Sequence, residues 1–316
     1  MKSYQQGVAL ITAMLIMAII ATLATSLALG QQVWLRQTQN LADLAQAERV
    51  RHGAYEYAAA VLVRDAKNAN TNKTDHLQEP WSQPISLPVD GGVVFIKIDD
   101  AQARFNLNNL VQQGQSVPDE ADIYRRLLAP FAPPTDLVNP LLDWIDEKPD
   151  TLAGGAEDLD YLNLDLPYRT ANQPLRSVNE LRLVKGYTEK MVEDLRPHVE
   201  VLPPTANRTK INVNTADKAV LDALIGTDST LAIEARARNP FETAQDFQRL
   251  FPGAQLKQNT YDVRSDFFIV TVIARIGRIE RRTEALIKRS SGSNASASVL
   301  WYRQPSIQIV IDEDKS

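Results

Sequence analysis

Residues 7–30 read GVALITAMLIMAIIATLATSLALG, and this stretch decides how the fold begins. From Val8 to Leu29 no side chain is charged over 22 positions. At about 1.5 Å of rise per residue, a helix of that length spans roughly the ~30 Å apolar core of a bilayer. A cleaved secretory signal has a shorter apolar region of about 7–15 residues. We therefore interpret residues 8–29 as a helix that crosses a membrane once.

The polar residues that follow continue the same helix. Residues 31–64 contain no proline and are rich in Ala, Leu and Gln, which favour helix. The chain then turns polar over residues 68–75, where we expect the helix to end. Apolar residues recur at three- and four-residue steps and predict one apolar stripe. The stripe comprises Trp34, Leu41, Leu44, Ala47, Val50, Ala54, Ala58 and Val61.

Strand-like segments frame a long central region. Four segments predict strands: 93–98, 267–276, 279–288 and 299–311. Residues 79–90 hold three prolines and are expected to form an extended linker. Residues 105–262 show short helical patterns with turn residues and little β-branched alternation. The sequence thus predicts an α+β fold, in which a long N-terminal helix packs on a small antiparallel sheet and a large α-helical region is inserted in that sheet.

The composition of the chain excludes several classes of function. The net charge of -5 and the pI near 5.4 argue against a protein that binds by neutralising nucleic-acid phosphates. The chain has no cysteine, which excludes disulfides and thiolate metal sites. Its three histidines, His52, His76 and His198, are scattered and suggest no catalytic triad or metal triplet. Protein partners are therefore expected, and an enzyme is not.

The first seven residues, MKSYQQG, resemble a type IV pilin-like leader. The resemblance implies that a prepilin peptidase cuts between Gly7 and Val8 and that Val8 becomes the methylated N-terminus. The fifth mature residue of pilins is normally a glutamate that neutralises the N-terminal amine of the subunit ahead, whereas here it is Thr12. A subunit with none ahead of it needs no such charge, because no buried amine has to be paired. The type II secretion minor pseudopilin K family lacks this glutamate.

The central region carries further resemblance to the same family. Its matching strings are 142–146 (LDWID), 155–158 (GAED) with Tyr161, 167–169 (PYR) with Asn172, 177–186 (SVNELRLVKG) and 211–216 (INVNTA). The resemblance implies an inserted domain of two SAM-like or helix-hairpin-helix-like units. The implied divisions are 1–7 leader, 8–29 transmembrane half of the helix, 30–104 soluble helix half, linker and first strand, 105–205 first unit with an acidic loop, 206–263 second unit, and 264–316 remaining strands.

Residues 143–165, here called the acidic loop, hold eight carboxylates against one cation, Lys148. Such crowding repels itself without a counterion, and hard oxygen ligands near glycines suit calcium. A solvated acidic surface is the competing interpretation. The family's inserted domain binds calcium, so the resemblance favours the ion. The predicted ligands are Asp146, Asp150, Glu157, Asp158 and, behind them, Asp160.

Two related strings, 105–110 (FNLNNL) and 211–216 (INVNTA), leave an alternative function open: an envelope protein that binds DNA through hairpin units. After the second string, however, the hairpin LIGTD holds one glycine, and Asp228 would repel phosphate. We favour Asn and Thr as caps of the helices that follow. The basic run at residues 275–289 is interpreted as a solvated sheet face. A tip adhesin or minor pilin of a type IV pilus shares the leader and helix but not the motifs of residues 142–186.

The function implied by the resemblance is a minor pseudopilin that forms the tip of the type II secretion pseudopilus and initiates its assembly. Its implied partners are the minor pseudopilins designated I and J, the major pseudopilin below it and the prepilin peptidase. The apolar stripe past the membrane is expected to pack against the two minor pseudopilins. The implied location is the bacterial inner membrane, single-pass, with the C-terminal region in the periplasm.

Overall fold

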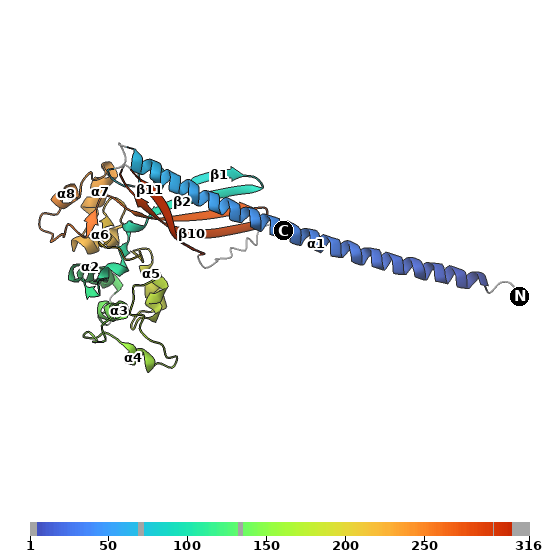
Figure 1. The fold of residues 1–316 in the computed structure, drawn as a ribbon, viewed down its shortest axis with the longest axis horizontal. Coiled ribbons are helices and arrows are strands. Elements are labelled where there is room, and N and C mark those ends of the chain that lie inside the picture. The colour runs from blue at the N-terminus through green and yellow to red at the C-terminus, as the bar shows by residue number, and fades with distance from the viewer. Residues whose placement is uncertain (1–4, 69–72, 132–134, 293, 305–316) are drawn as a thin grey trace.

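The computed structural model describes residues 5–68, 73–131, 135–292 and 294–304, with side chains from Val8 onward. A long N-terminal helix packs on an antiparallel sheet, and helical segments lie between two strands of that sheet (Figure 1). The coarse α+β architecture expected from the sequence is therefore confirmed. Met1 to Tyr4, the first part of the predicted leader, lie outside the described residues.

The helix α1 runs from Gln5–Lys67 without a break over 63 residues. That length corresponds to about 95 Å, and Figure 1 shows its first half projecting away from the rest of the molecule. By length and composition α1 can cross a membrane, and its most apolar window is not buried at all. The expected end near residue 68 is confirmed.

The second half of α1 packs on the sheet through small residues. Ala47, Ala54 and Ala58 are buried there beside Tyr55 and Leu62. Alanines keep the helix surface flat, so the helix can approach the sheet closely. The Tyr55 hydroxyl donates a 2.7 Å hydrogen bond to the Thr283 hydroxyl. From Leu44 onward, the apolar stripe predicted from the sequence therefore faces the molecule's own sheet.

The start of that stripe behaves differently. Trp34 is 65% exposed and Leu41 67% exposed. The expectation that the whole stripe faces other subunits is wrong for its C-terminal part, because the molecule's own sheet covers that part. Of the stripe residues, those before Leu44 are therefore left exposed on the surface of α1.

The sheet has five strands in the order β1-β2-β9-β10-β11, and every neighbouring pair is antiparallel. Their bounds are β1 Ile85–Val89, β2 Gly92–Asp100, β9 Phe267–Ile276, β10 Ile279–Ser290 and β11 Ser296–Arg303. The structure confirms three predicted strands, at 93–98, 267–276 and 279–288. The fourth prediction, 299–311, overlaps β11, and its residues after 304 lie outside the described part of the chain.

One sheet prediction needs correction. The segment interpreted as linker contains the edge strand β1, preceded by a short 3-10 turn, η1, at Pro80–Ser82. Pro88 lies opposite Val93 in the β1–β2 pair. Proline tolerates an edge position because only one side of such a strand must donate hydrogen bonds. The prolines therefore exclude residues 79–90 from a central position in the sheet but still allow an edge strand there.

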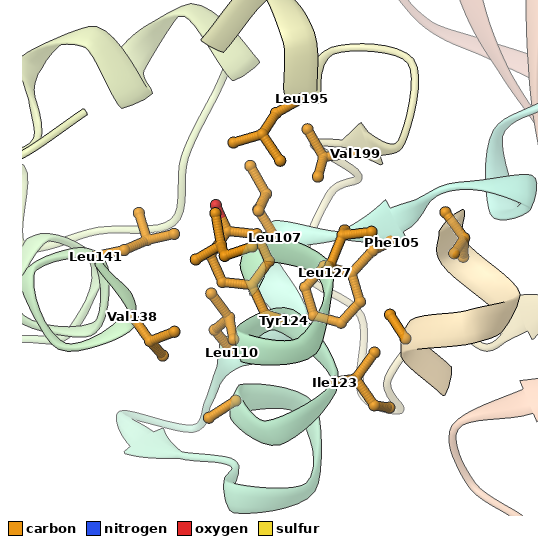
Figure 2. Close-up of a cluster of buried hydrophobic side chains, with 14 of the residues drawn as sticks. Phe105, Leu107, Leu110, Ile123, Tyr124, Leu127, Val138, Leu141, Leu195 and Val199 are labelled. Atoms are coloured by element: carbon orange, nitrogen blue, oxygen red, sulfur yellow. The ribbon is translucent and has the colours of Figure 1, made fainter. Parts of the chain in front are cut away.

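The inserted region between β2 and β9 has its own core. Its helices are α2 Pro118–Leu128, α3 Val138–Ile145, α4 Asp158–Leu162, α5 Glu189–Leu195, α6 Lys218–Ile225, α7 Thr230–Arg238 and α8 Ala244–Arg249. Its 3-10 turns are η2 Ala101–Ala103, η3 Leu107–Leu110, η4 Ala129–Phe131 and η5 Val178–Leu183. Its short strands are β3 Phe105–Asn106, β4 Val111–Gln112, β5 Gln115–Ser116, β6 Val199–Glu200, β7 Ile211–Asn212 and β8 Tyr261–Asp262. Figure 2 shows Phe105 and Tyr124 inside this core, where their rings stack with centroids 5.4 Å apart.

The inserted region repeats one hydrogen-bonded frame. In its first half β3 pairs in parallel with β6, and Asn108 exchanges hydrogen bonds with the backbone N–H and carbonyl of Leu175. In its second half β7 pairs in parallel with β8, and Asn214 exchanges the same two bonds with Phe241. Each frame continues into a capped helical segment: Ser177 caps η5 in the first half, and Thr243 caps α8 in the second. The two related strings of the sequence thus occupy equivalent places.

The two halves differ in the segment that precedes the residue bonded to the bridging asparagine. That residue is Leu175 in the first half and Phe241 in the second. In the second half α7 ends at Arg238 and Phe241 follows within three residues. In the first half α3 ends at Ile145, and Leu175 follows only after the acidic loop and α4. The acidic loop is therefore an addition to a frame that is complete without it.

Candidate functional site

The acidic loop is organised around Asp143, which is 1% exposed on α3. Its carboxylate accepts hydrogen bonds from the backbone N–H groups of Leu152 and Ala156, the latter at 2.9 Å. A side chain at Gly155 would clash with the same carboxylate. Asp143 is one of the loop's eight carboxylates but is not among the ligands predicted from the sequence. Nothing in the residue spacing shows that its side chain folds the loop back on the helix.

Asp146 and Glu157 are also buried, at 6% and 7% exposure. Burial, together with the nearby carboxylates of Asp143, Asp146 and Asp158, raises the pKa of Glu157 to about 7. One carboxylate oxygen of Glu157, Oε1, is buried without a hydrogen-bond partner. A buried oxygen surrounded by like charges is a place where a proton or a cation is stabilised.

The remaining predicted ligands have other contacts. Asp158 accepts hydrogen bonds from Thr170, which lower its pKa most, and from Arg169 at 3.0 Å. Asp160 pairs with Lys185 at 2.9 Å and accepts the backbone N–H of Glu157, which caps α4. Asp150 is exposed and bonds to no other described residue. Among the described residues, the acidic loop does not bring three carboxylate oxygens within 4.8 Å of one another.

A second group of carboxylates does meet that spacing. Asp65 at the end of α1, Asp75 and Glu79 each place one oxygen within 4.8 Å of the others. The guanidinium of Arg289, on β10, pairs with Asp65 at 2.8 Å and with Asp75 at 2.6 Å. We call these four residues the junction cluster. The sequence did not indicate it, because its members lie up to 224 positions apart and no local pattern links them.

Charge in the junction cluster is not balanced by Arg289 alone. Burial raises the pKa of Glu79 to about 7, against the opposing effect of its hydrogen bond from Trp81. Its Oε1 is buried without a hydrogen-bond partner, and the Nε2 atom of His76 lies 4.0 Å from it. Three carboxylates around one guanidinium form a group that could take up a proton or a cation. Arg289, which is 2% exposed, also corrects the interpretation of the basic run as wholly solvated.

A buried polar network extends the junction toward the inserted region. The Asp100 carboxylate, at the end of β2, accepts hydrogen bonds from Thr215, Ser265 and Asn212 at 2.6–2.9 Å. Burial raises its pKa to about 6. Ser265 also donates its backbone N–H to Asp75. Asn212 and Thr215 therefore tie the second half of the inserted region to the sheet.

The capping prediction holds for one string and not for the other. The side chain of Asn106 caps the turn η3, as expected. Helix α6 is capped by Asp217 instead of by Asn or Thr. Asp217 also bonds to His198 at 2.6 Å, so His198 is partly buried and not a plain surface residue. In the hairpin that follows, Lys218 is held by Asp222 at 2.8 Å and by Asp228.

Thr12 lies on the exposed, apolar part of α1, where its hydroxyl donates to the carbonyl of Ala9 at 3.0 Å. The backbone therefore satisfies this side chain without any ionic partner. Gly7 belongs to α1 and Val8, also in α1, is 62% exposed.

Two models of one family, both described as type II secretion system protein K, match residues 103–204 and 211–264. Type II secretion system protein K of Pseudomonas aeruginosa is 34% identical over 317 residues, covering 95% of this chain and 93% of that protein. The protein of the same description from Klebsiella pneumoniae is 32% identical over 310 residues, covering 92% and 94%.

A solved structure is also similar. It is a chain of the GspK–GspI–GspJ complex from the type 2 secretion system of enterotoxigenic Escherichia coli, with a TM-score of 0.74 and 27% identity. The match covers 86% of this chain and 100% of that one. Both kinds of similarity extend over far more than the inserted region.

Proposed function

The chain belongs to the type II secretion system protein K family, and from this premise we propose that it is the minor pseudopilin at the tip of the secretion pseudopilus. Its family consists of structural pseudopilins and not of catalysts. The observation that carries the proposal is the division of α1. Its first half is bare and its second half is packed on the molecule's own sheet, so the first half is free to enter an assembly.

The partners proposed are the I and J minor pseudopilins, because the similar chain from E. coli was solved with GspI and GspJ. The open stretch of α1 that includes Trp34 and Leu41 supplies apolar surface for them. The inserted region lies at the far end of the molecule from the start of α1 (Figure 1). A bulky region at that end would prevent a further subunit from adding above it, which supports a role in starting or capping the filament with the major pseudopilin below.

The membrane steps are proposed from the leader and α1. A prepilin peptidase would cut between Gly7 and Val8, Val8 would be methylated, and α1 would anchor the chain once in the inner membrane with the C-terminal region in the periplasm. Thr12 supports the tip position, because its hydroxyl is satisfied by the backbone and offers no charge to a preceding subunit's amine.

The inserted region is proposed to consist of two SAM-like units, 105–205 and 206–263, between the 30–104 and 264–316 parts of a pilin-like domain. The repeated Asn108 and Asn214 bridges support this division. A DNA-binding role gains no support from the hairpin, where Lys218 is already held by two carboxylates.

Calcium is proposed to bind the acidic loop. The orphaned Oε1 of Glu157 and the mutual repulsion among buried carboxylates fit a hard cation, which prefers oxygen ligands. Asp146 and Glu157 would be joined by Asp150, Asp158 and Asp160. The ion would compete with Arg169 and Lys185 for the last two.

Co-expression of the full chain with the two partner pseudopilins, followed by purification in detergent, tests the proposed function. We expect a complex that survives size-exclusion chromatography. A Trp34→Ser, Leu41→Ser variant should weaken it, whereas Tyr57→Ser, on an exposed position of the packed half of α1, should not. Recovery of the chain alone, with both partners folded, would contradict the tip assignment.

A further inference from the structure

A bare stretch of α1 separates the apolar run from the sheet. The apolar run ends at Leu29, and residues 31–42 are all exposed. Asp43 is the first residue after this stretch that is partly buried, and its carboxylate lies against Gly277 in the turn between β9 and β10. Figure 1 shows the sheet packed along only the later part of α1. No described residue outside α1 therefore covers the side chains of residues 31–42.

The position of Trp34 in this stretch matches the head-group layer of a bilayer. A bilayer of about 40–45 Å has an apolar core of about 30 Å, so each head-group layer is about 5–8 Å thick. Trp34 follows Leu29 by about 7.5 Å along the helix, and its side chain leans back toward the N-terminus. Tryptophan is enriched in that layer because its ring is apolar and its N–H donates a hydrogen bond. Leu41, about 18 Å beyond Leu29, lies outside the layer.

The charges near the end of the apolar run suit anionic lipid. Residues 1–42 contain no acidic side chain, and Arg36 is the first charged residue after Lys2. Arg36 is exposed and pairs with no carboxylate of the described residues. Its Cα lies about 10 Å beyond Leu29, and a long arginine side chain can extend back along the helix to the lipid phosphates. A guanidinium binds a phosphate through two parallel hydrogen bonds.

We propose that Trp34 and Arg36 anchor the unassembled chain in the phospholipid head-group layer at the end of the apolar run, Trp34 through its ring and Arg36 through a lipid phosphate. This inference rests on the proposed function, in which residues 8–29 cross the inner membrane. The two residues lie on opposite sides of α1, and lipid surrounds a helix that crosses a bilayer, so both contact the layer at once. The anchor sets how deeply α1 is inserted before assembly, and joining the pseudopilus exchanges this lipid for the partner pseudopilins.

The test uses the fluorescence of Trp34 in the full chain, reconstituted into vesicles of phosphatidylcholine and phosphatidylglycerol. Of the four tryptophans, Trp81 and Trp144 are buried and Trp301 is half-buried, so the spectrum of Trp34→Phe is subtracted as background. One set of vesicles carries a nitroxide on the lipid head group, and the other carries it near the end of the acyl chain. The head-group nitroxide should quench Trp34 at least about twofold more than the acyl-chain nitroxide.

Two further variants locate the contact. Trp34→Phe combined with Leu41→Trp moves the fluorophore beyond the layer and should lose most of the head-group quenching. Arg36→Glu places a negative charge against anionic lipid and should lower the quenching of Trp34 by about half or more. The matched control is Arg49→Glu, at an exposed position of α1 beside the sheet, and it should quench like the parent.

Three results would overturn the anchor: equal head-group quenching when the fluorophore is moved, stronger quenching from the acyl chain, or unchanged quenching in Arg36→Glu. If Trp34 is shielded only after the two partner pseudopilins are added, the stretch is a partner site and the anchor is wrong. A chain that does not float with the vesicles would contradict both the anchor and the proposed membrane step. If head-group quenching is seen but no complex forms with the partners, the tip function fails while the anchor stands.

Discussion

The junction cluster and the acidic loop are both groups of buried carboxylates, yet only one of them contains a buried cation from the chain itself. In the junction cluster Arg289 pairs with Asp65 and Asp75. In the acidic loop Asp143, Asp146 and Glu157 are buried, while the nearby cations Arg169 and Lys185 are exposed and pair at the periphery. Similar side chains thus serve a fixed structural joint in one place and leave an uncompensated charge in the other. A cluster of acidic residues has no single meaning until its cations are located.

Removing the buried cation should have the largest effect on that contrast. Arg289→Gln leaves Asp65 and Asp75 buried without their partner, so we expect the free energy of unfolding to fall by about 3–5 kcal/mol. Chemical denaturation of the full chain in detergent measures it. Arg282→Gln, on the exposed face of the same strand, should change stability by at most about 0.5 kcal/mol. Equal effects of the two substitutions would refute the role assigned to the junction cluster.

Supplying a cation should have the next largest effect, and only at the acidic loop. Calcium at about 100 times its Kd should stabilise the folded chain by about 2.7 kcal/mol and raise the Tm, and a chelator should reverse the shift. Glu157→Gln should abolish most of the rise, whereas Glu79→Gln should preserve it. A rise lost with Glu79→Gln but retained with Glu157→Gln would move the ion to the junction cluster. No rise at all would eliminate the calcium site.

A change of pH should have a smaller effect on stability, and it should act through Glu79 of the junction cluster. The pKa of Glu79 is raised to about 7 in the folded chain. A raised pKa means that its contribution to stability is complete below its unfolded value of about 4.3 and is lost as the pH rises through about 7. Between pH 5 and pH 8 the parent should lose about 2 kcal/mol that Glu79→Gln retains.

Parallel denaturation series at both pH values provide the measurement for Glu79. Glu56→Gln, on an exposed position of α1, is the control and should follow the parent. If parent and Glu79→Gln show the same pH dependence, Glu79 titrates at its ordinary pKa and the junction cluster is not protonated near neutrality.

Much of the element pattern could be predicted because it depends on local periodicity. The long helix, its end and the strands at β2, β9 and β10 follow from apolar spacing and turn residues. The edge strand β1 was missed because prolines mask extended pairing at an edge. For the acidic loop, composition indicated the charge but not its arrangement. The roles of Asp143 and of Asp160, which caps α4, depend on backbone N–H groups that only the folded loop presents.

The family membership and the long apolar helix were determined by the sequence alone, because the span length and the ordered motifs are properties of the chain read in order. The tertiary structure decided which part of the helix stripe is free and which carboxylates share a cation. It also decided that Asn108 and Asn214 hold equivalent frames. These features join residues up to hundreds of positions apart. Burial changes the energy of a charge or an apolar surface only once such distant segments are packed together.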